Sequence, residues 1–453
     1  MAAPATPSRT VHPPGFRPRR GLNWFILGAM YASYYMCRYN FRFATPGMVA
    51  EFGFSKSDIT DMLSVWSIAY GTGQLVNGLL TDRIGGKTAM LIGAAGTITL
   101  NLTFGFASFV GTFSTMALIW LLNGWFQSFG APGMVKINAA WFNRDERGTF
   151  AGIFGFMIQS GQFAINNLAP LILAGFAIGT WVVAPNDWRW LFRLPPIATA
   201  IMAVLLALIP KESPEQAGYP GVISGDGEGD TGVRTSVKES FVAIFTHPLV
   251  WFYAIAYACT GAVRNSSDQL AVLYFAEQLH LDLAKKPPAV FWTMNLMPMV
   301  AVLGSFTAGW VSDRFFRGHR SPVAMTLYFF ESLVILCAAI IIYTGVVGPT
   351  PIGILLGCFF LVLVSLTANS THAIVGSAAP MDIGGRKMAG FATGVIDSFQ
   401  YYGTAIALPI TGRLIDKYGW GVWYPTMAGF GFVGGVAMLL VTRKQRALKA
   451  KSA

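Results

Sequence analysis

The sequence predicts an all-α integral membrane protein with twelve transmembrane helices in two six-helix halves. The first reason is composition: of 453 residues, 54% are hydrophobic and only 12% are charged, against roughly 25% charged in soluble proteins. The second is the length of the charge-free runs, such as those between Lys87 and Lys136 and between Arg147 and Asp187. The third is one polar stretch, residues 211–240, which separates two sets of six apolar runs.

Each predicted span is justified by its length and by the charges, Gly or Pro residues that bound it. A helix needs about 20 apolar residues to cross about 30 Å of hydrocarbon, and its backbone groups must pair internally there. The runs predict spans over residues 22–45, 58–80, 88–110, 113–142, 149–176, 192–210, 243–275, 288–312, 321–346, 350–376, 386–412 and 420–442. The segments outside the halves 22–210 and 241–442 are a polar N-terminal tail (1–21) without a signal-peptide core, the linker 211–240 and a basic tail (443–453).

The cations predict the orientation of these spans. Of the 32 Lys and Arg residues, 21 fall on the side that holds both termini and the linker, and seven fall on the opposite side. Loops rich in Lys and Arg stay in the cytoplasm, so we expect both termini and the linker to be cytoplasmic. The net charge of +11 is then mainly a topology signal, with the lipid bilayer and not a nucleic acid as the partner. Four cations lie within spans or near their ends: Arg38, Arg42, Lys136 and Arg264.

A short motif occurs at the same place in both halves. Each copy has Gly, three residues, then Asp-Arg, in GLLTDRIGGK (78–87) after span two and in AGWVSDRFFRGHR (308–320) after span eight. Two such halves related by an axis along the membrane normal are the layout of major facilitator transporters. A small Gly lets neighbouring helices approach closely, and the Asp and Arg side chains can pair with nearby charges. The alternative is that each Asp-Arg is only a salt pair at the membrane interface. We predict that these residues hold the cytoplasmic side shut in one state: Gly78, Asp82, Arg83, Asp313 and Arg314, with Glu146 and Arg147 of the loop after span four.

Further motifs resemble a particular family. They are YASYYMCRYNF (31–41), SIAYG (67–71), NGWFQSFGAPG (123–133), ESPEQAGYP (212–220), NSTHAIVG (369–376) and IDKYGW (415–420). Together they resemble the organophosphate:phosphate antiporter family of the major facilitator superfamily, over about residues 22–442. The resemblance implies a multi-pass protein of the bacterial inner membrane that exchanges an organic phosphate for phosphate by rocker-switch alternating access.

The resemblance also implies a phosphate site. In that family one Arg of span one and one of span seven bind the phosphate, and Arg38 and Arg264 occupy these places. Lys136 matches a basic residue that follows the family's span-four motif. The sequence departs from the family at four positions: Tyr39 and Gln74 replace lysines, Ile158 beside Gln159 replaces a histidine, and Pro298 lies where the family has an acid.

The two intramembrane arginines carry most of the functional information. A charge at bilayer depth costs roughly 2.5–3.5 kcal/mol on insertion scales, so it needs a partner or a ligand. The planar guanidiniums of Arg38 and Arg264 suit phosphate or carboxylate. Each cation also has an alternative to binding a substrate anion. Arg38 can form a salt bridge to a neighbouring helix, and Arg264 can form an i,i+4 ion pair with Asp268. Lys136 can extend to the cytoplasmic surface.

Other polar residues complete the candidate site. Asp397, in GVIDSFQYYG (394–403), lies in mid-span eleven, where it pairs with a cation or binds a proton or a substrate amine. Several uncharged or neutral side chains are candidates for hydrogen bonds to a substrate, or for bonds between helices: Tyr34, Tyr70, Gln74, Gln159, Asn369 and His372.

We therefore expect a monomeric secondary transporter for a small organic anion, with an organophosphate or phosphonate-like solute exchanged for phosphate. Two alternatives remain: a proton-coupled symporter of a carboxylate or zwitterion that uses Asp397, and a transport-like membrane sensor. The sequence has no nucleophile–base pair and no cluster with metal-ligand spacing, so we expect neither an enzyme nor a cofactor.

Overall fold

The computed structural model describes residues 12–142, 147–222, 242, 245–247, 249–316 and 320–452. Within these ranges, side chains are not described for residues 147–156, 158, 178, 181, 313, 377–393 and 448–452. Of the predicted cytoplasmic motif residues, Glu146 and the side chains of Arg147 and Asp313 therefore lie outside the description.

The first half is a bundle of helices whose bounds follow the predicted spans with local differences. Its helices are α1 (Phe16–Phe52), α2 (Lys56–Ile84), α3 (Gly86–Phe106), α4 (Phe113–Gln127), α5 (Gly130–Trp141), α6 (Arg147–Leu173), α7 (Trp190–Arg193) and α8 (Pro195–Leu208). Predicted span four is interrupted between α4 and α5, where the Ser128 hydroxyl donates to the carbonyl of Trp125 at 2.7 Å. A side chain that bonds the backbone in this way competes with the helical ladder. Predicted span six is interrupted before Pro195, which begins α8 and suits a first helical position.

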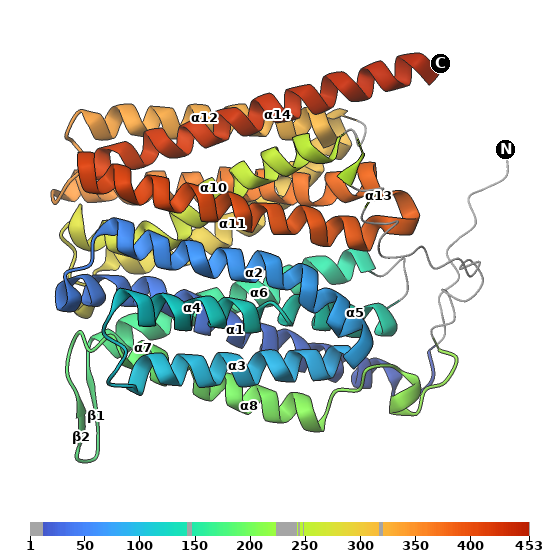
Figure 1. Ribbon diagram of the computed structural model, residues 1–453, viewed down its shortest axis with the longest axis horizontal. Helices are drawn as coiled ribbons and strands as arrows, with labels where there is room; N and C mark the ends of the chain where they lie inside the picture. Colours follow the sequence, from blue (N-terminus) through green and yellow to red (C-terminus); the bar gives the residue numbers. More distant parts are fainter. Residues whose placement is uncertain are drawn as a thin grey trace.

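A small hairpin was not predicted. β1 (Phe176–Ile178) pairs antiparallel with β2 (Trp181–Val183), and Phe176 lies opposite Val183. The turn between the strands contains Gly179, whose φ of 62° suits a tight hairpin turn. The hairpin follows α6 and lies in the loop before α7, outside the helical bundle (Figure 1).

The second half consists of α10 (Val250–Glu277), α11 (Pro288–Phe316), α12 (Arg320–Tyr343), α13 (Pro351–Tyr418) and α14 (Trp423–Ser452), with short 3-10 turns at Glu215–Ala217, Leu283–Lys285 and Trp420–Val422. α13 has 68 residues and would be about 100 Å long if it were straight. Yet the start of α13 and the 3-10 turn that directly follows its end both lie against Tyr274. A Cβ on Gly357 would be 3.3 Å from the Tyr274 hydroxyl, and the ring of Trp420 is 5.4 Å from that of Tyr274. α13 therefore reverses direction, and its two arms, 351–376 and 394–418, correspond to predicted spans ten and eleven.

The described helices cross the bundle twelve times. In this count α4 and α5 together form one crossing, α7 and α8 together form another, and the two arms of α13 form two. This confirms the predicted fold class. In the described part of the chain, six segments are long and apolar enough to span a membrane by length and composition: Gly86–Phe106, Trp190–Leu208, Pro288–Phe316, Arg320–Tyr343, Pro351–Gly376 and Trp420–Ala447. The helices outside this set include α1, α2 and α10, which carry the polar residues of the candidate site.

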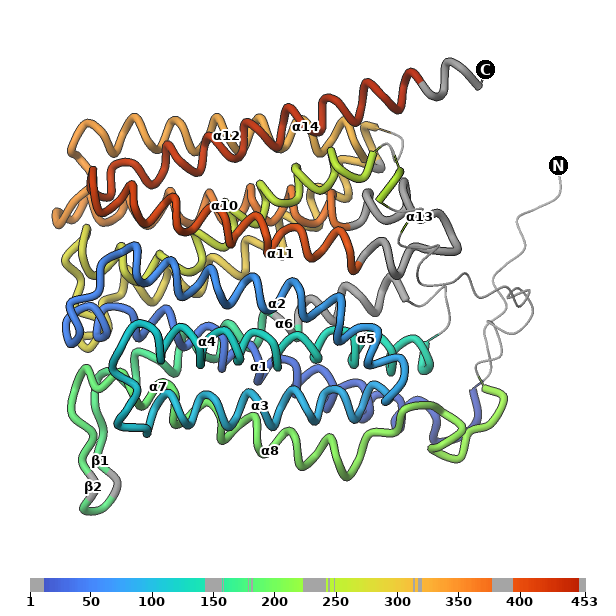
Figure 2. The backbone as a smooth tube through the Cα atoms, viewed as in Figure 1, coloured from blue at the N-terminus to red at the C-terminus, as the bar shows by residue number. Residues whose placement is uncertain are grey.

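The two halves lie side by side (Figure 1). α1 to α8, coloured blue to green, form one layer, and α10 to α14, yellow to red, form the other. α2 runs beside the second arm of α13 along the boundary between them. α1 begins and α14 ends at the same end of the bundle, as the tube in Figure 2 shows, which agrees with an even number of crossings.

Glycine contacts relate the two halves. A Cβ on Gly161 of α6 would lie 2.1 Å from the carbonyl oxygen of Ala32 on α1. A Cβ on Gly403 in the second arm of α13 would lie 2.1 Å from the carbonyl oxygen of Ala258 on α10. Both contacts join the fifth helix of a half to its first helix, and only glycine permits so close an approach of two backbones. This supports the predicted two-fold relation between the halves.

The start of the predicted linker is docked on the first half and not free in solvent. The Glu212 carboxylate accepts hydrogen bonds from the N–H groups of Gly86 (3.3 Å) and Lys87 (2.9 Å) at the start of α3. These N–H groups have no partner within the helix, and the helix dipole favours an anion there. Asn23 of α1 also pairs with the backbone of Lys211. Residues 211–222 thus belong structurally to the first half.

Candidate functional site

Arg38 is buried midway along α1, with 4% of its surface exposed. Its Nε donates to Oε1 of Gln127 on α4 at 3.1 Å, and Gln127 is held in turn by the carbonyl of Cys37 at 3.2 Å. The Nη2 of Arg38 is buried and has no hydrogen-bond partner. A buried donor without a partner is costly, so this nitrogen is available for an anion.

Aromatic rings surround the Arg38 guanidinium. Its Cζ lies 4.6 Å from the ring centre of Tyr35, 4.7 Å from that of Trp66 and 4.3 Å from that of Tyr70. Tyr70 also lies 4.6 Å from Tyr401, which belongs to the second arm of α13. Ring faces attract a cation without neutralising it. The cage therefore stabilises the charge of Arg38 while Nη2 stays without a hydrogen-bond partner.

Arg264 holds the corresponding place on α10 and is half-buried. Its Nε donates to Oδ1 of Asn369 at 2.9 Å, and Asn369 is fixed by the carbonyl of Ser365 at 2.8 Å. In the described part of the chain, no carboxylate lies within 4.0 Å of the Arg264 or the Arg38 guanidinium. Asp268, one turn further on, thus does not form the i,i+4 ion pair that would have neutralised Arg264.

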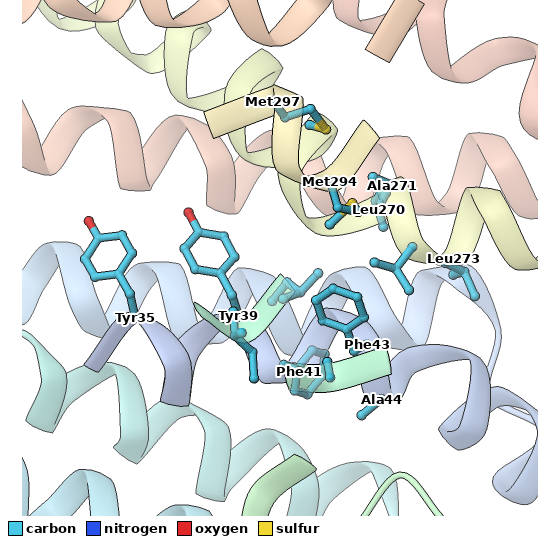
Figure 3. Packing of buried hydrophobic residues seen from close by; sticks show 14 of the residues in the cluster. Tyr35, Tyr39, Phe41, Phe43, Ala44, Leu270, Ala271, Leu273, Met294 and Met297 are labelled. Carbon is cyan, nitrogen blue, oxygen red and sulfur yellow. The ribbon is translucent and has the colours of Figure 1, made fainter. Parts of the chain in front are cut away.

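The two arginines share neighbours at the boundary of the halves. Tyr35 and Tyr401 each act electrostatically on both Arg38 and Arg264. Figure 3 shows Tyr35 and Tyr39 projecting from the same face of α1, away from the helix axis. The spacing of these tyrosines, four residues apart, places them one above the other on a helix. The site is therefore built from both halves, with one arginine contributed by each.

Asp397 joins the same site from the second arm of α13. Its Oδ1 accepts a hydrogen bond from Nε2 of Gln400 at 2.8 Å. The amide of Gln74 on α2 lies near this carboxylate, and Oε1 of Gln74 is buried without a hydrogen-bond partner. Arg264 and Arg38 are its electrostatic neighbours. Asp397 and Gln74 thus connect the two halves beside the arginines.

His372 and Asn369 lie one turn apart on the first arm of α13. Nδ1 of His372 is 2.9 Å from the hydroxyl of Tyr257 on α10, and the two rings stack at 5.4 Å. Arg264 also acts electrostatically on His372. The structure therefore brings Asn369 and His372 close to Arg264.

Two predicted site residues lie elsewhere. The hydroxyl of Tyr34 donates to the carbonyl of Met90 on α3, so it connects helices of the first half. Nζ of Lys136 lies 3.0 Å from the carbonyl of Thr81 and 2.8 Å from that of Asp82. A cation at these last carbonyls of α2 is favoured by the helix dipole, and Lys136 is thus engaged at the end of α2.

Gln159 and the conformational motif are described only in part. Oε1 of Gln159 is buried without a partner. A Cβ on Gly78 would be 4.0 Å from Pro132, an ordinary contact between α2 and α5. Asp82 lies 3.9 Å from Lys136, and Arg83 and Arg314 are exposed. The cytoplasmic network therefore stays a prediction.

Reasoning from the sequence missed several groups around the two arginines. Gln127, Trp66, Tyr35 and Tyr257 were not candidates, although each contacts a predicted site residue. Helical spacing was the available signal for Tyr35, which lies three residues before Arg38. Gln127 lies within the quoted motif NGWFQSFGAPG, but nothing in one sequence places it against α1.

The two halves are joined at the end opposite the termini by a group of residues that we call the inter-half latch: Lys56, Ser57, Asp61, Glu277, Arg413 and Asp416. The Asp416 carboxylate accepts from the N–H groups of Lys56 (2.9 Å) and Ser57 (2.8 Å) at the start of α2. Burial raises the pKa of Asp416, but the hydrogen bonds from Ser57 and Lys56 outweigh it and lower the pKa below the ordinary value.

Two ion pairs complete the inter-half latch. Arg413 meets Asp61 at 3.2 Å, and Lys56 meets Glu277 at 3.1 Å. Closer to the site, Nη1 of Arg42 on α1 donates to the carbonyl of Asp268 on α10 at 2.9 Å. The predicted topology makes this end external. The structure thus shows the halves in contact from the site to the predicted external end.

Comparison with known proteins identifies the family. The Major Facilitator Superfamily matches residues 27–407. The membrane sensor protein UhpC of Escherichia coli is 25% identical over 423 residues, which cover 91% of this chain and 89% of that protein. The glycerol-3-phosphate transporter of Bacillus subtilis is 28% identical over 400 residues (86% and 85%). A probable hexose phosphate transport protein of Chlamydia pneumoniae is 26% identical over 419 residues (86% and 84%).

Solved structures share the fold. A bacterial homolog of the human lysosomal transporter Spinster matches with a TM-score of 0.72 at 13% identity, covering 94% of this chain and 98% of that one. The D-xylose-proton symporter matches with a TM-score of 0.67 at 13% identity (92% and 96%). Among the described residues, no group of three or more His, Cys, Asp or Glu is placed to hold a metal ion. The chain is a multi-pass membrane protein of the transporter type. It belongs to the major facilitator superfamily.

Proposed function

We propose that this protein exchanges an organophosphate or phosphonate-like solute for inorganic phosphate across the bacterial inner membrane, by alternating access of one site between its two halves. The observation that carries the proposal is the pair of arginines, Arg38 and Arg264. Each half supplies one, and neither has a carboxylate within 4.0 Å among the described residues. Two relatives are named as transporters of phosphorylated solutes, which supports the same anion class.

The geometry offers a reason for obligatory exchange. With no anion bound, the site holds two buried or half-buried guanidiniums with free donors, and moving such a site past the membrane interior is costly. A phosphate or phosphonate would accept hydrogen bonds from both arginines and offset their charge. Because the arginines belong to different halves, the bound anion would also favour states in which the halves close around it. Only the loaded site then changes sides readily.

The test is counterflow in proteoliposomes. Purified protein is reconstituted with unlabelled phosphate inside, and uptake of labelled phosphate and of labelled glycerol-3-phosphate is measured without a proton gradient. We expect uptake with internal phosphate and almost none without it. Uptake that needs a pH gradient and not internal phosphate would instead establish the proton symporter.

A second measurement distinguishes a transporter from a membrane sensor. One relative is named as a membrane sensor, so binding and transport are measured on the same preparation. A phosphate-induced rise in the melting temperature, without counterflow of any phosphate ester tried, would contradict exchange and favour sensing. A rise in melting temperature accompanied by counterflow supports exchange.

A further inference from the structure

Asp397 is an acid without a cationic partner in a site that otherwise selects anions. Its carboxylate accepts a hydrogen bond from a neutral amide, that of Gln400, at 2.8 Å, and the amide of Gln74 lies nearby. Within the described residues no Lys or Arg nitrogen lies within 4.0 Å of it. A neutral amide can donate a hydrogen bond to a carboxylate, but it carries no charge that could pair with it.

Both cationic and aromatic groups surround Asp397. The guanidiniums of Arg38 and Arg264 act on Asp397 electrostatically without contacting it. The titratable tyrosines near Asp397 are Tyr35 of α1, Tyr257 of α10 and Tyr401 of its own arm. A doubly charged anion alone would satisfy the arginines but would be repelled by the carboxylate.

The aromatic neighbours suit a cation. Tyr401 follows Asp397 by one helical turn, and its ring lies 4.6 Å from that of Tyr70. A carboxylate beside tyrosine rings is the combination that binds an ammonium group, because the charge pairs with the acid and the N–H or C–H groups lie on ring faces. The Arg38 guanidinium already occupies one such position, against Tyr70 at 4.3 Å.

We propose that Asp397 binds the protonated amine of a zwitterionic phosphate or phosphonate whose acid end lies between Arg38 and Arg264. This inference rests on the proposed function, because it assigns the second pole of the same substrate. The substrate class is then a small aminoalkyl phosphonate or phosphate ester. In the amine's absence, the Gln400 amide holds the carboxylate in place.

A matched pair of probes tests the proposal. 2-Aminoethylphosphonate and ethylphosphonate share the acid end and differ by the amine. In competition against counterflow of labelled phosphate, we expect wild-type protein to prefer 2-aminoethylphosphonate by about tenfold or more, as a charge-assisted hydrogen bond would give. Asp397→Asn should remove this preference while it keeps, or improves, inhibition by ethylphosphonate.

Two further variants keep the result interpretable. Asp397→Glu retains the charge and should retain a preference for the amine, even if a weaker one. Glu331→Gln removes a different buried acid, which bonds Thr371 at 3.2 Å in the second half, and should leave the preference unchanged. If Asp397→Asn lost phosphate counterflow altogether, the Asp397→Glu comparison would decide, and loss of the preference there would overturn the proposal.

The outcomes separate this inference from the proposed function. If wild-type protein exchanges phosphate but does not distinguish the two probes, the inference is wrong and the exchange function stands. If Asp397→Asn changes the pH dependence of phosphate exchange and not the choice of probe, Asp397 binds a proton, and the inference is again overturned. If phosphate and ethylphosphonate neither exchange nor bind, the proposed function itself has failed.

Discussion

A guanidinium that is buried without a carboxylate must be compensated in some other way. For Arg38 the compensation is a cage of three rings and one amide oxygen, with Nη2 left unpaired. Cation–π contacts are worth about 0.5–2 kcal/mol each, depending on desolvation. They stabilise the charge without occupying the edge of the guanidinium, which is the part that recognises an oxyanion.

Replacing Arg38 by lysine separates charge from geometry. Arg38→Lys keeps one positive charge but loses the planar fork, so we expect the concentration of phosphate for half-maximal counterflow to rise about 10- to 100-fold. Arg17→Lys, at an exposed position of α1, is the matched control and should behave as wild type. An Arg38→Lys variant with unchanged phosphate dependence would show that charge alone suffices.

Helix packing within each half depends on single glycines. The contacts of Gly161 with Ala32 and of Gly403 with Ala258 bring backbones together at equivalent places in the two halves. They fix how closely α6 packs on α1, and the second arm of α13 on α10. α1 and α10 carry the arginines, so these glycines set the positions of both halves of the site.

Adding one methyl group at Gly403 tests this packing. A Cβ there would meet backbone atoms of Ala258 between 2.1 and 2.5 Å away, so the helices must move apart. We expect Gly403→Ala to destabilise the protein by about 1–3 kcal/mol, seen as a lower melting temperature in detergent. Gly429→Ala, with no heavy atom within 4 Å of the added Cβ, should melt as wild type. Equal melting temperatures would show that the contact is easily relaxed.

The inter-half latch uses the start of α2 as an anion site. Asp416→Asn should lower the equilibrium constant for closing the inter-half latch by about two- to fivefold. The reason is that an exposed carboxylate at a helix N-terminus contributes about 0.3–1 kcal/mol. The measurement is the rate at which a membrane-impermeant thiol reagent labels Thr60→Cys. Thr60 is fully buried behind Gly412, so the reagent reaches this position only when the latch opens. Asp282→Asn, whose ion pair with Lys285 stays within its own loop, is the control.

The pH dependence of the same labelling has a definite sign. The hydrogen bonds lower the pKa of Asp416 in the latched state. Its contribution is therefore complete above the ordinary aspartate pKa of about 3.9 and is lost only as the pH falls through the lowered value. Labelling of Thr60→Cys, normalised to the exposed Lys285→Cys, should stay constant from pH 8 to pH 5. A rise within that range would assign the latch to another titrating group.

At the scale of the whole molecule, charge-free runs and one polar interruption suffice to predict twelve crossings in two halves, because span length is dictated by the bilayer. The breaks at Ser128 and Pro195 and the hairpin around Gly179 depend on local hydrogen bonds and turn geometry, which a hydropathy pattern does not contain. Arg38, Arg264 and Asp397 stand out in the sequence because intramembrane charge is costly. Their uncharged partners do not, since Gln127 and Trp66, for example, meet Arg38 only through tertiary packing.

Alternating access requires that the inter-half latch open during every transport cycle. A cross-link there should therefore stop transport without destroying the site. The Ser57 hydroxyl lies 2.5 Å from the Asp416 carboxylate, so the Ser57→Cys/Asp416→Cys pair is within reach of a short, reducible thiol cross-linker. With the native cysteines replaced, we expect cross-linking to abolish phosphate counterflow and reduction to restore it.

Phosphate should still raise the melting temperature of the cross-linked protein, because Arg38 and Arg264 remain in place. The single-cysteine variants, treated in the same way, are the controls. Undiminished counterflow in the cross-linked protein would mean that the halves do not separate at this end during transport.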